Sequence, residues 1–328
     1  MYKFSLGQLN ELIKIFQKKY EVWAPVQTGK LVNFEKNFEI KNITLKYPCS
    51  QIGIKKIFFP AKEILFEVKK GKGQAPKIKK PMAVIAAHPV DLIALSRIEE
   101  SFSAPPADYY FNRRKENCFL TGITPSPNNK YFNHLLLSYP VEFDLFFHFH
   151  TEKIYLVEIG SKLGENFVLK HKNIFFPTQI TIKIPPIKTE KNIFSDPVKL
   201  AKIIEKSQGK KIWKELEKIC LNCGICAWVC PLCYCFSIND EISSSGDACK
   251  RCRQWDSCVL PKFSQISGGY NFRPTPGDRL DNWYYHKFVR AVRERGKIDC
   301  VGCNRCIENC PAKINFRKII KKLATKKE

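Results

Sequence analysis

The sequence has no long apolar run. Its first twenty residues place charged side chains such as Lys3, Glu11 and Lys14 between apolar ones, which breaks the continuous apolar core of a secretory signal peptide. No other stretch approaches the roughly 18 apolar residues of a membrane-spanning helix. We therefore expect a cytoplasmic protein, and we interpret the N-terminal segment as an amphipathic helix capped by Ser5. Its apolar side comprises Leu6, Leu9, Leu12, Ile13 and Phe16.

Cysteine is nearly absent from the first part of the chain. Only Cys49 and Cys118 precede residue 200, whereas the other thirteen of the fifteen cysteines follow it. The 328 residues are enough for about two domains. The contrast predicts a cysteine-poor domain at 1–195 and a cysteine-dense domain at 196–328. Because the expected compartment keeps thiols reduced, the clustered cysteines favour metal binding over a disulfide scaffold.

Acidic residues are few relative to basic ones. The chain has 55 lysines and arginines but 31 aspartates and glutamates, which gives a formal charge of +24. Such a charge fits either an anionic partner or a solvated lysine-rich surface. The lysines are spread along the chain without a helix–turn–helix or RNP motif, so we favour the solvated surface over nucleic-acid binding. Residues 69–81 hold six lysines with Gly and Pro, which predicts a surface loop or hairpin tip rather than a phosphate-binding loop.

The cysteine-poor part alternates short apolar runs with amphipathic segments. Residues 82–87 form a strand-like run, a His-Pro turn breaks it, and Asp91 is placed to cap a following helix. This order of strand, turn and helix is typical of α/β domains. Further strands are expected at 30–34, 54–60, 118–123, 144–149 and 153–159, with edge or linker chain at 174–187. A helix over 197–219 is expected to lead into the cysteine-dense part.

Two four-cysteine runs, at 220–230 and 300–310, share the spacing C-x2-C-x2-C-x3-C, and proline follows each. The first three cysteines of such a run wrap a loop around one [4Fe–4S] cube, whereas the fourth points at the neighbouring cluster. The spacing therefore predicts two clusters with crossed ligands. One set is Cys220, Cys223, Cys226 and Cys310, and the other is Cys300, Cys303, Cys306 and Cys230. Structural zinc fits poorly, because it takes separated cysteine pairs in a tetrahedral site.

The insert between the runs, at about 232–298, is longer than the segment that separates the runs of an ordinary two-cluster ferredoxin. It holds five more cysteines, which are Cys233, Cys235, Cys249, Cys252 and Cys258. The C-x-C and C-x2-C pairs among them could bind zinc or a third cluster. Alternatively, these cysteines are reduced structural thiols, and the sequence leaves both interpretations open. Arg273 and Arg279 lie in a Gly- and Pro-rich stretch and are interpreted as ordinary surface arginines.

The cysteine-dense part resembles a known family. In order along the chain, the stretches CLNCGICAWVCPLCYCF, RQWDSC, GGYNFRPTPGDR and CVGCNRCIENCPAKINF resemble the β subunit of cytoplasmic sulfhydrogenases, which belong to the NADP-linked [NiFe]-hydrogenases. They are also similar to the electron-transfer subunit of anaerobic sulfite reductase. The resemblance is close over about 200–320 and extends weakly through WAPV, FFP and AAHPVDLIAL. Cys233, Cys235 and Cys258 match cysteines of the family's insert, whereas Cys249 and Cys252 do not.

The resemblance implies a non-catalytic electron-transfer subunit without a substrate site of its own. Its partners would be a flavoprotein that binds FAD and NAD(P)H, and the catalytic subunits of a [NiFe]-hydrogenase or sulfur reductase. The alternative is the corresponding subunit of an anaerobic sulfite reductase. The expected fold class is α+β, with an N-terminal α/β-type domain followed by a ferredoxin-like domain for two [4Fe–4S] clusters.

The N-terminal domain departs from the family. Relatives carry a cysteine after the His-containing turn, where this chain has Val90, so we do not expect a cluster in this domain. Cys49 and Cys118 are interpreted as buried thiols. His88 is interpreted as a turn residue that is satisfied by hydrogen bonds.

Overall fold

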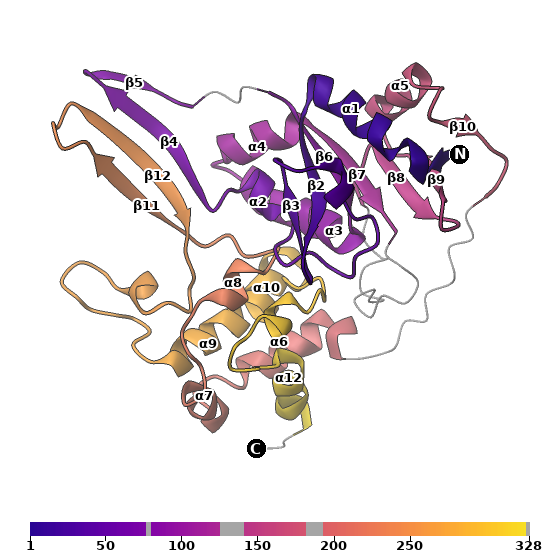
Figure 1. Ribbon diagram of the computed structural model, residues 1–328. Helices are drawn as coiled ribbons and strands as arrows, with labels where there is room; N and C mark the ends of the chain where they lie inside the picture. The colour runs from indigo at the N-terminus through magenta and orange to yellow at the C-terminus, as the bar shows by residue number, and fades with distance from the viewer. Residues whose placement is uncertain (77–79, 125–140, 182–192, 326–328) are drawn as a thin grey trace. The chain divides into compact units, whose positions relative to one another are not determined.

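The computed structural model describes residues 1–76, 80–124, 141–181 and 193–325. The chain divides into two compact units. The first comprises Met1–Pro60 and Pro76–Lys188, and the second comprises Ala61–Ala75 and Thr189–Glu328. Helices and strands occur in both units, and the fold is α+β as the sequence predicts (Figure 1). The sequence did not indicate that residues 61–75 belong with the second unit.

The first unit is built on an eight-stranded sheet in the order β10-β1-β9-β8-β7-β6-β2-β3 (Figure 1). Strands β2, β6, β7 and β8 run parallel to one another, whereas the pairs at both ends are antiparallel. The strands are β1 Tyr2–Ser5, β2 Glu21–Thr28, β3 Leu31–Glu35, β6 Met82–Ala87, β7 Cys118–Ile123, β8 Leu145–Phe149, β9 Ile154–Ile159 and β10 Phe176–Pro177. All six residues of β6 are buried, as expected for a central parallel strand.

Helices cover both faces of this sheet. On one face, Phe16 of α1 (Leu9–Lys19) stacks on Phe167 of α5 (Lys162–Lys170) with ring centroids 4.6 Å apart, and both rings contact Phe119 of β7. On the other face, Leu92 of α3 (Pro89–Ser103) lies directly over β7 at Gly122, where an added Cβ would come within 2.9 Å of Cδ1 of Leu92. The unit also contains the helices α2 Lys55–Phe58 and α4 Tyr109–Glu116.

Several local expectations in the first unit are wrong in detail. Residues 54–60 contain the short helix α2 rather than a strand, because periodicity cannot distinguish the two in so short an apolar run. The helix after β6 begins at Pro89 with His88 as its N-cap, and Asp91 lies in the first turn instead of capping it. Proline is favoured at the first helical position because its missing N–H has no partner there anyway.

The N-terminal helix is confirmed as α1, with Leu12, Ile13 and Phe16 buried. Ser5, however, ends strand β1 and precedes a 3₁₀ turn, η1 (Leu6–Gln8), so it does not cap α1 itself. Of the extended segment expected at 174–187, the edge strand β10 is observed, and residues 182–187 lie outside the described part of the chain.

The second unit combines helices with one sheet. Its helices are α6 Pro197–Glu205, α7 Lys211–Glu217, α8 Ile225–Trp228, α9 Pro276–Tyr285, the π-helical turn η6 His286–Arg290, α10 Ala291–Arg295, α11 Arg305–Glu308 and α12 Phe316–Thr325. The single helix expected over 197–219 is wrong, because the chain turns at Gly209, whose φ of +73° suits glycine, and so forms α6 and α7. Within the described residues, no helix has both the length and the apolarity to cross a membrane.

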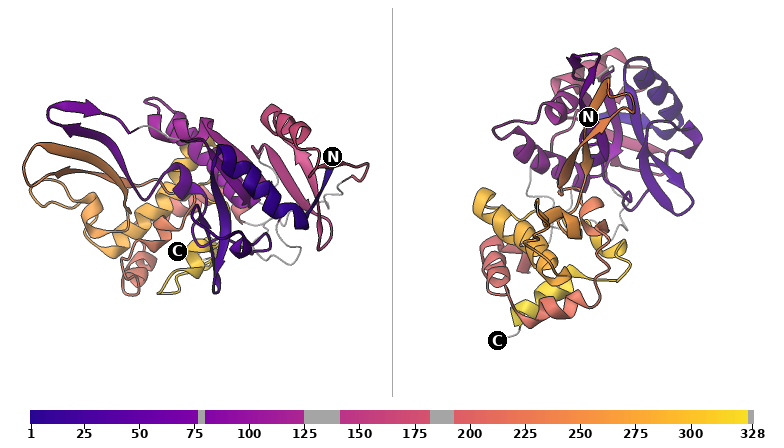
Figure 2. Two further views of the ribbon diagram at one scale, coloured as in Figure 1. Left: turned by 45° about the horizontal axis from the view of Figure 1, so that its top comes forward. Right: turned by 90° about the vertical axis from the view of Figure 1, so that its left-hand side faces the viewer.

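An antiparallel four-stranded sheet in the order β11-β12-β4-β5 extends away from these helices (Figure 2). Its strands are β4 Lys62–Lys69, β5 Lys72–Gln74, β11 Phe236–Ile242 and β12 Ala248–Trp255. The hairpin tip expected within 69–81 is observed between β4 and β5, and residues 77–79 lie outside the description. Arg253 of β12 forms a buried ion pair with Glu63 of β4, which ties residues 61–75 to the insert.

Candidate metal centres

The first cysteine run forms a tight loop between α7 and α8. Cys220, Cys223 and Cys226 follow one another around this loop, and the two residues that reverse the chain are Asn222 (φ +52°) and Gly224 (φ +74°). Both residues have the left-handed backbone conformation that glycine and asparagine adopt most readily. The sequence therefore folds locally so that three cysteines border one space.

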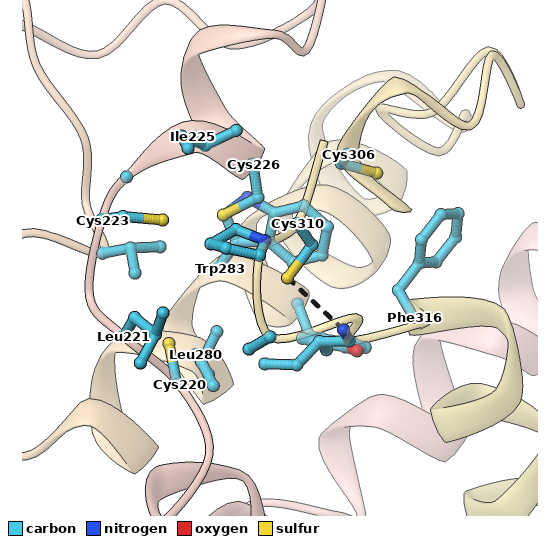
Figure 3. Close-up of a pocket in the computed structure, with 16 residues that line it drawn as sticks. Cys220, Leu221, Cys223, Ile225, Cys226, Leu280, Trp283, Cys306, Cys310 and Phe316 are labelled. Carbon is cyan, nitrogen blue, oxygen red and sulfur yellow. Dashed lines mark hydrogen bonds between the residues drawn. The ribbon is translucent and has the colours of Figure 1, made fainter. Parts of the chain in front are cut away.

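The fourth sulfur that borders this space comes from the second run. Cys310 lines the same pocket as Cys220, Cys223 and Cys226, and Figure 3 shows the four sulfurs turned toward a common centre. Cys306 also lines the pocket, but its sulfur points away from the other four in this view. Burial, followed by the neighbouring thiols of Cys220, Cys223 and Cys310, raises the pKa of Cys226 to about 12. The structure thus brings together the first predicted set of four cysteines.

The second run repeats the loop with its two left-handed residue types exchanged. Gly302 (φ +69°) stands where the first loop has asparagine, and Asn304 (φ +58°) stands where it has glycine. The cysteines of this loop, Cys300, Cys303 and Cys306, line a second pocket together with Cys230 of the first run. Burial raises the pKa of Cys306 well above its usual value, and Cys303, Cys230 and Cys300 add to the rise. The second predicted set is therefore also brought together.

The two pockets are neighbours. Trp283, Cys306 and Phe316 line both of them, and the short helices α8 and α11 that follow the two loops pack against each other. Each run therefore contributes its first three cysteines to its own pocket and its fourth to the adjacent pocket, and Cys306 borders both. This arrangement places two sulfur-lined sites side by side with shared walls.

Several polar groups around the pockets fit iron–sulfur clusters. The buried Nε1 of Trp283 and the buried hydroxyl of Tyr284 have no hydrogen-bond partner among the described residues, and both residues line the first pocket. In cluster sites, sulfide and thiolate sulfurs accept hydrogen bonds from such donors. Backbone N–H groups already donate to sulfur, from Gly302 to Cys300 at 3.4 Å and from Ile314 to Cys310 at 3.3 Å. The cysteine set and the orphaned donors together match a cluster-binding site.

The thiols themselves are poor ligands without a compensating cation. Burial raises the pKa of Cys303 to about 11 and that of Cys220 above its usual value. A thiol must lose its proton to bind metal, and the apolar walls disfavour that charge. The pKa of Cys230 is instead lowered, by a hydrogen bond with Cys233 and by the ammonium of Lys287. Iron would supply the missing positive charge at the other positions.

Arg279 is a structural residue that the sequence did not reveal. Its side chain is 2% exposed, so the interpretation as a surface arginine is wrong. It donates to the carbonyls of Val259, Arg273 and Pro274, and to Oδ1 of Asn222 at 3.0 Å. These bonds hold the first cysteine loop against the C-terminal half of the insert. No local sequence pattern reveals the contact with the cysteine loop, because Asn222 lies 57 residues before Arg279.

The five insert cysteines are divided between two places, because Cys233, Cys235 and Cys258 lie near one another whereas Cys249 and Cys252 lie on a strand. Cys233 is hydrogen-bonded to Cys230, and Cys235 to Cys258. Cys249 and Cys252 lie on strand β12, opposite Ile242 and Asn239 of β11. Within the described residues, no three Cys, His, Asp or Glu side chains converge as ligands of a single metal ion.

The N-terminal candidates lie in the first unit. Cys49 and Cys118 are half-buried rather than fully buried, although burial of the sulfur raises the pKa of Cys118. His88 is buried at the N-terminus of α3, and its ring stacks on Tyr47 with centroids 4.0 Å apart. The turn position expected for His88 is observed, and the stacking contact was not foreseen.

Comparisons with known proteins agree with this geometry. A family model described as a 4Fe-4S dicluster domain matches residues 219–314, which include both cysteine runs and the insert. The sulfhydrogenase 2 subunit beta of Pyrococcus furiosus is 30% identical over 314 residues, which cover 91% of this chain and 91% of that protein. No solved structure matches the chain.

Proposed function

Because this chain belongs to the family of sulfhydrogenase beta subunits, we propose that it relays single electrons between a flavoprotein subunit, which binds FAD and NAD(P)H, and the catalytic subunits of a [NiFe]-hydrogenase or sulfur reductase. Its general role is that of an iron–sulfur electron-transfer subunit. We expect the complex to be cytoplasmic.

The observation that carries the proposal is the exchange of cysteines between the two loops. Cys310 borders the pocket of the first loop, and Cys230 borders the pocket of the second. We propose that each pocket holds one [4Fe–4S] cluster, which supplies a one-electron centre. The ligands of cluster 1 are Cys220, Cys223, Cys226 and Cys310, and those of cluster 2 are Cys300, Cys303, Cys306 and Cys230. Because Trp283, Cys306 and Phe316 line both pockets, we expect the two centres to lie close enough to exchange electrons.

The first experiment is a count of iron and acid-labile sulfide after anaerobic purification. We expect about eight of each per chain, from two four-iron clusters. A count near four would contradict the two-cluster proposal. A count near twelve, or bound zinc, would point to a third metal in the insert, for which the adjacent thiols of Cys233, Cys235 and Cys258 remain the candidates.

The partner proposal is tested by co-purification from the native cells. We expect a flavoprotein and a [NiFe] subunit to accompany the chain. A sirohaem protein in place of the [NiFe] subunit would support the alternative, an anaerobic sulfite reductase. A strictly solitary protein would contradict the role of a subunit.

A further inference from the structure

A buried lysine lies against one of the proposed cluster ligands. Lys287 is 5% exposed, and its Nζ lies 3.1 Å from Sγ of Cys230 and 2.9 Å from the carbonyl oxygen of Asp299. It belongs to the π-helical turn η6, an irregularity that is frequent at functional sites. Its ammonium also lies over the ring of Trp283, 5.2 Å from the centroid. Lys287 therefore lines the pocket of cluster 2 with its charged end inward.

The charge of Lys287 is not matched by a carboxylate. Within the described residues it forms no ion pair with Asp or Glu, and its close partners are a carbonyl, a sulfur and an aromatic ring. An unpaired buried ammonium is costly, and such groups are retained where they meet an opposite charge. The negative partner of this ammonium is thus the sulfur side of cluster 2.

The surroundings of cluster 1 differ in this respect. The buried cation that holds the first cysteine loop is Arg279, whose four hydrogen bonds all go to carbonyl or amide oxygens rather than to sulfur. The second pocket has a further buried cation beside it, because Arg305, 2% exposed, begins helix α11 two residues after Cys303. Fixed positive charge is therefore concentrated at the second site.

We propose that Lys287 is a positioning residue for electron transfer, whose ammonium makes cluster 2 easier to reduce than cluster 1. The inference rests on the proposed function and its ligands. A [4Fe–4S] cluster with four thiolates carries a charge of about −2 when oxidised and gains one more negative charge on reduction. A cation in direct contact with a ligand sulfur stabilises the reduced form more than the oxidised form, since attraction grows with the charge. An electron that enters the pair of clusters therefore resides on cluster 2, which is the cluster next to Lys287.

The test is a redox titration of the iron-loaded protein followed by EPR. In the wild type we expect two reduction steps. Lys287→Met should move the higher-potential step downward by at least 59 mV, which is a tenfold change for a one-electron couple, and should move the other step less. Lys287→Arg keeps the charge and should retain most of the wild-type potential. Lys318→Met removes an exposed lysine from α12 and should move neither step.

A second variant separates charge from assembly. Lys287→Gln keeps a donor for Cys230 and Asp299 but has no charge, so its higher step should also fall while about eight irons are retained. Unchanged potentials with full iron, or equal shifts of both steps, would overturn the tuning role and leave the proposed function intact. Loss of cluster 2 from both uncharged variants would overturn it as well, because the charge would then serve assembly. A wild-type protein that fails to bind eight irons would contradict the proposed function itself.

Discussion

The two cysteine pockets are built from the same spacing but lie in different surroundings. All four cysteines of the first set are partly exposed, and Leu221 at its edge is 64% exposed. In the second set Cys230 and Cys303 are buried, and Lys287 contacts a ligand sulfur. Identical motifs therefore place the sulfurs equivalently, whereas residues outside the motifs decide solvent access and charge. Both of these quantities set the potential of a cluster.

The largest expected effect comes from breaking the exchange of cysteines between the sites. The double variant Cys220→Ala/Cys310→Ala removes two ligands of one proposed cluster. It should keep the other cluster and about half of the roughly eight irons. The double variant Cys220→Ala/Cys230→Ala removes one ligand from each site, so both clusters should be incomplete. Iron analysis and EPR distinguish these results.

The two double variants control each other, because each lacks two cysteines. If each run held its own cluster, the outcomes would be reversed. Cys220→Ala/Cys230→Ala would then retain half of the iron, and Cys220→Ala/Cys310→Ala would damage both sites. Such a reversed outcome would contradict the proposal that each cluster takes its fourth ligand from the other run.

Arg279 offers a way to weaken the first site alone. Arg279→Met leaves the carbonyls of Val259, Arg273 and Pro274, and Oδ1 of Asn222, without this donor. Each buried acceptor that loses its partner lowers the free energy of unfolding by about 1–3 kcal/mol. Because water can reach some of these acceptors, we expect a total loss of about 3 kcal/mol. We expect a chelator to remove iron from cluster 1 faster, with cluster 2 little changed. The comparison variant is Arg273→Met, whose side chain is partly exposed.

The left-handed residues of the loops give a smaller, graded effect on stability. A Cβ at Gly224 would lie 3.1 Å from Cβ of Ser257 and 3.3 Å from Cγ of Leu260, and its φ is +74°. Gly224→Ala should therefore cost more than the ~1–2 kcal/mol that a left-handed backbone costs an ordinary residue. Gly296→Ala has a similar φ, +67°, with nothing within 4 Å, and should cost only the backbone part. Anaerobic thermal unfolding measures both, and equal melting temperatures would contradict the close packing at Gly224.

The spacing of each run predicts the cysteines and their grouping locally, and the structure places each predicted set around one pocket. Sequence reasoning missed Lys287 and Arg279 for a common reason. Lys287 and Cys230 are 57 residues apart, as are Arg279 and Asn222, so neither contact leaves a local pattern. In the first unit the buried parallel strand at 82–87 was predictable from its apolar run. The short helix α2 was not, because four residues are too few to show a period.

We expect the smallest change in the cluster potentials from a substitution at Tyr284. Its hydroxyl is buried without a partner among the described residues, and its pKa is raised by burial and by the thiols of Cys306, Cys226 and Cys310. Because these thiols belong to both sets, the hydroxyl lies where it can donate to sulfur of either cluster. Tyr284→Phe removes only the donor and keeps the ring. We expect a small downward shift of one or both reduction steps in the EPR titration, less than that of Lys287→Met, since a neutral donor stabilises the added electron less than a full charge does. An upward shift of the potentials would show that the hydroxyl does not donate to the clusters. A downward shift as large as that of Lys287→Met would contradict the view that the charge of Lys287 sets the difference between the two sites.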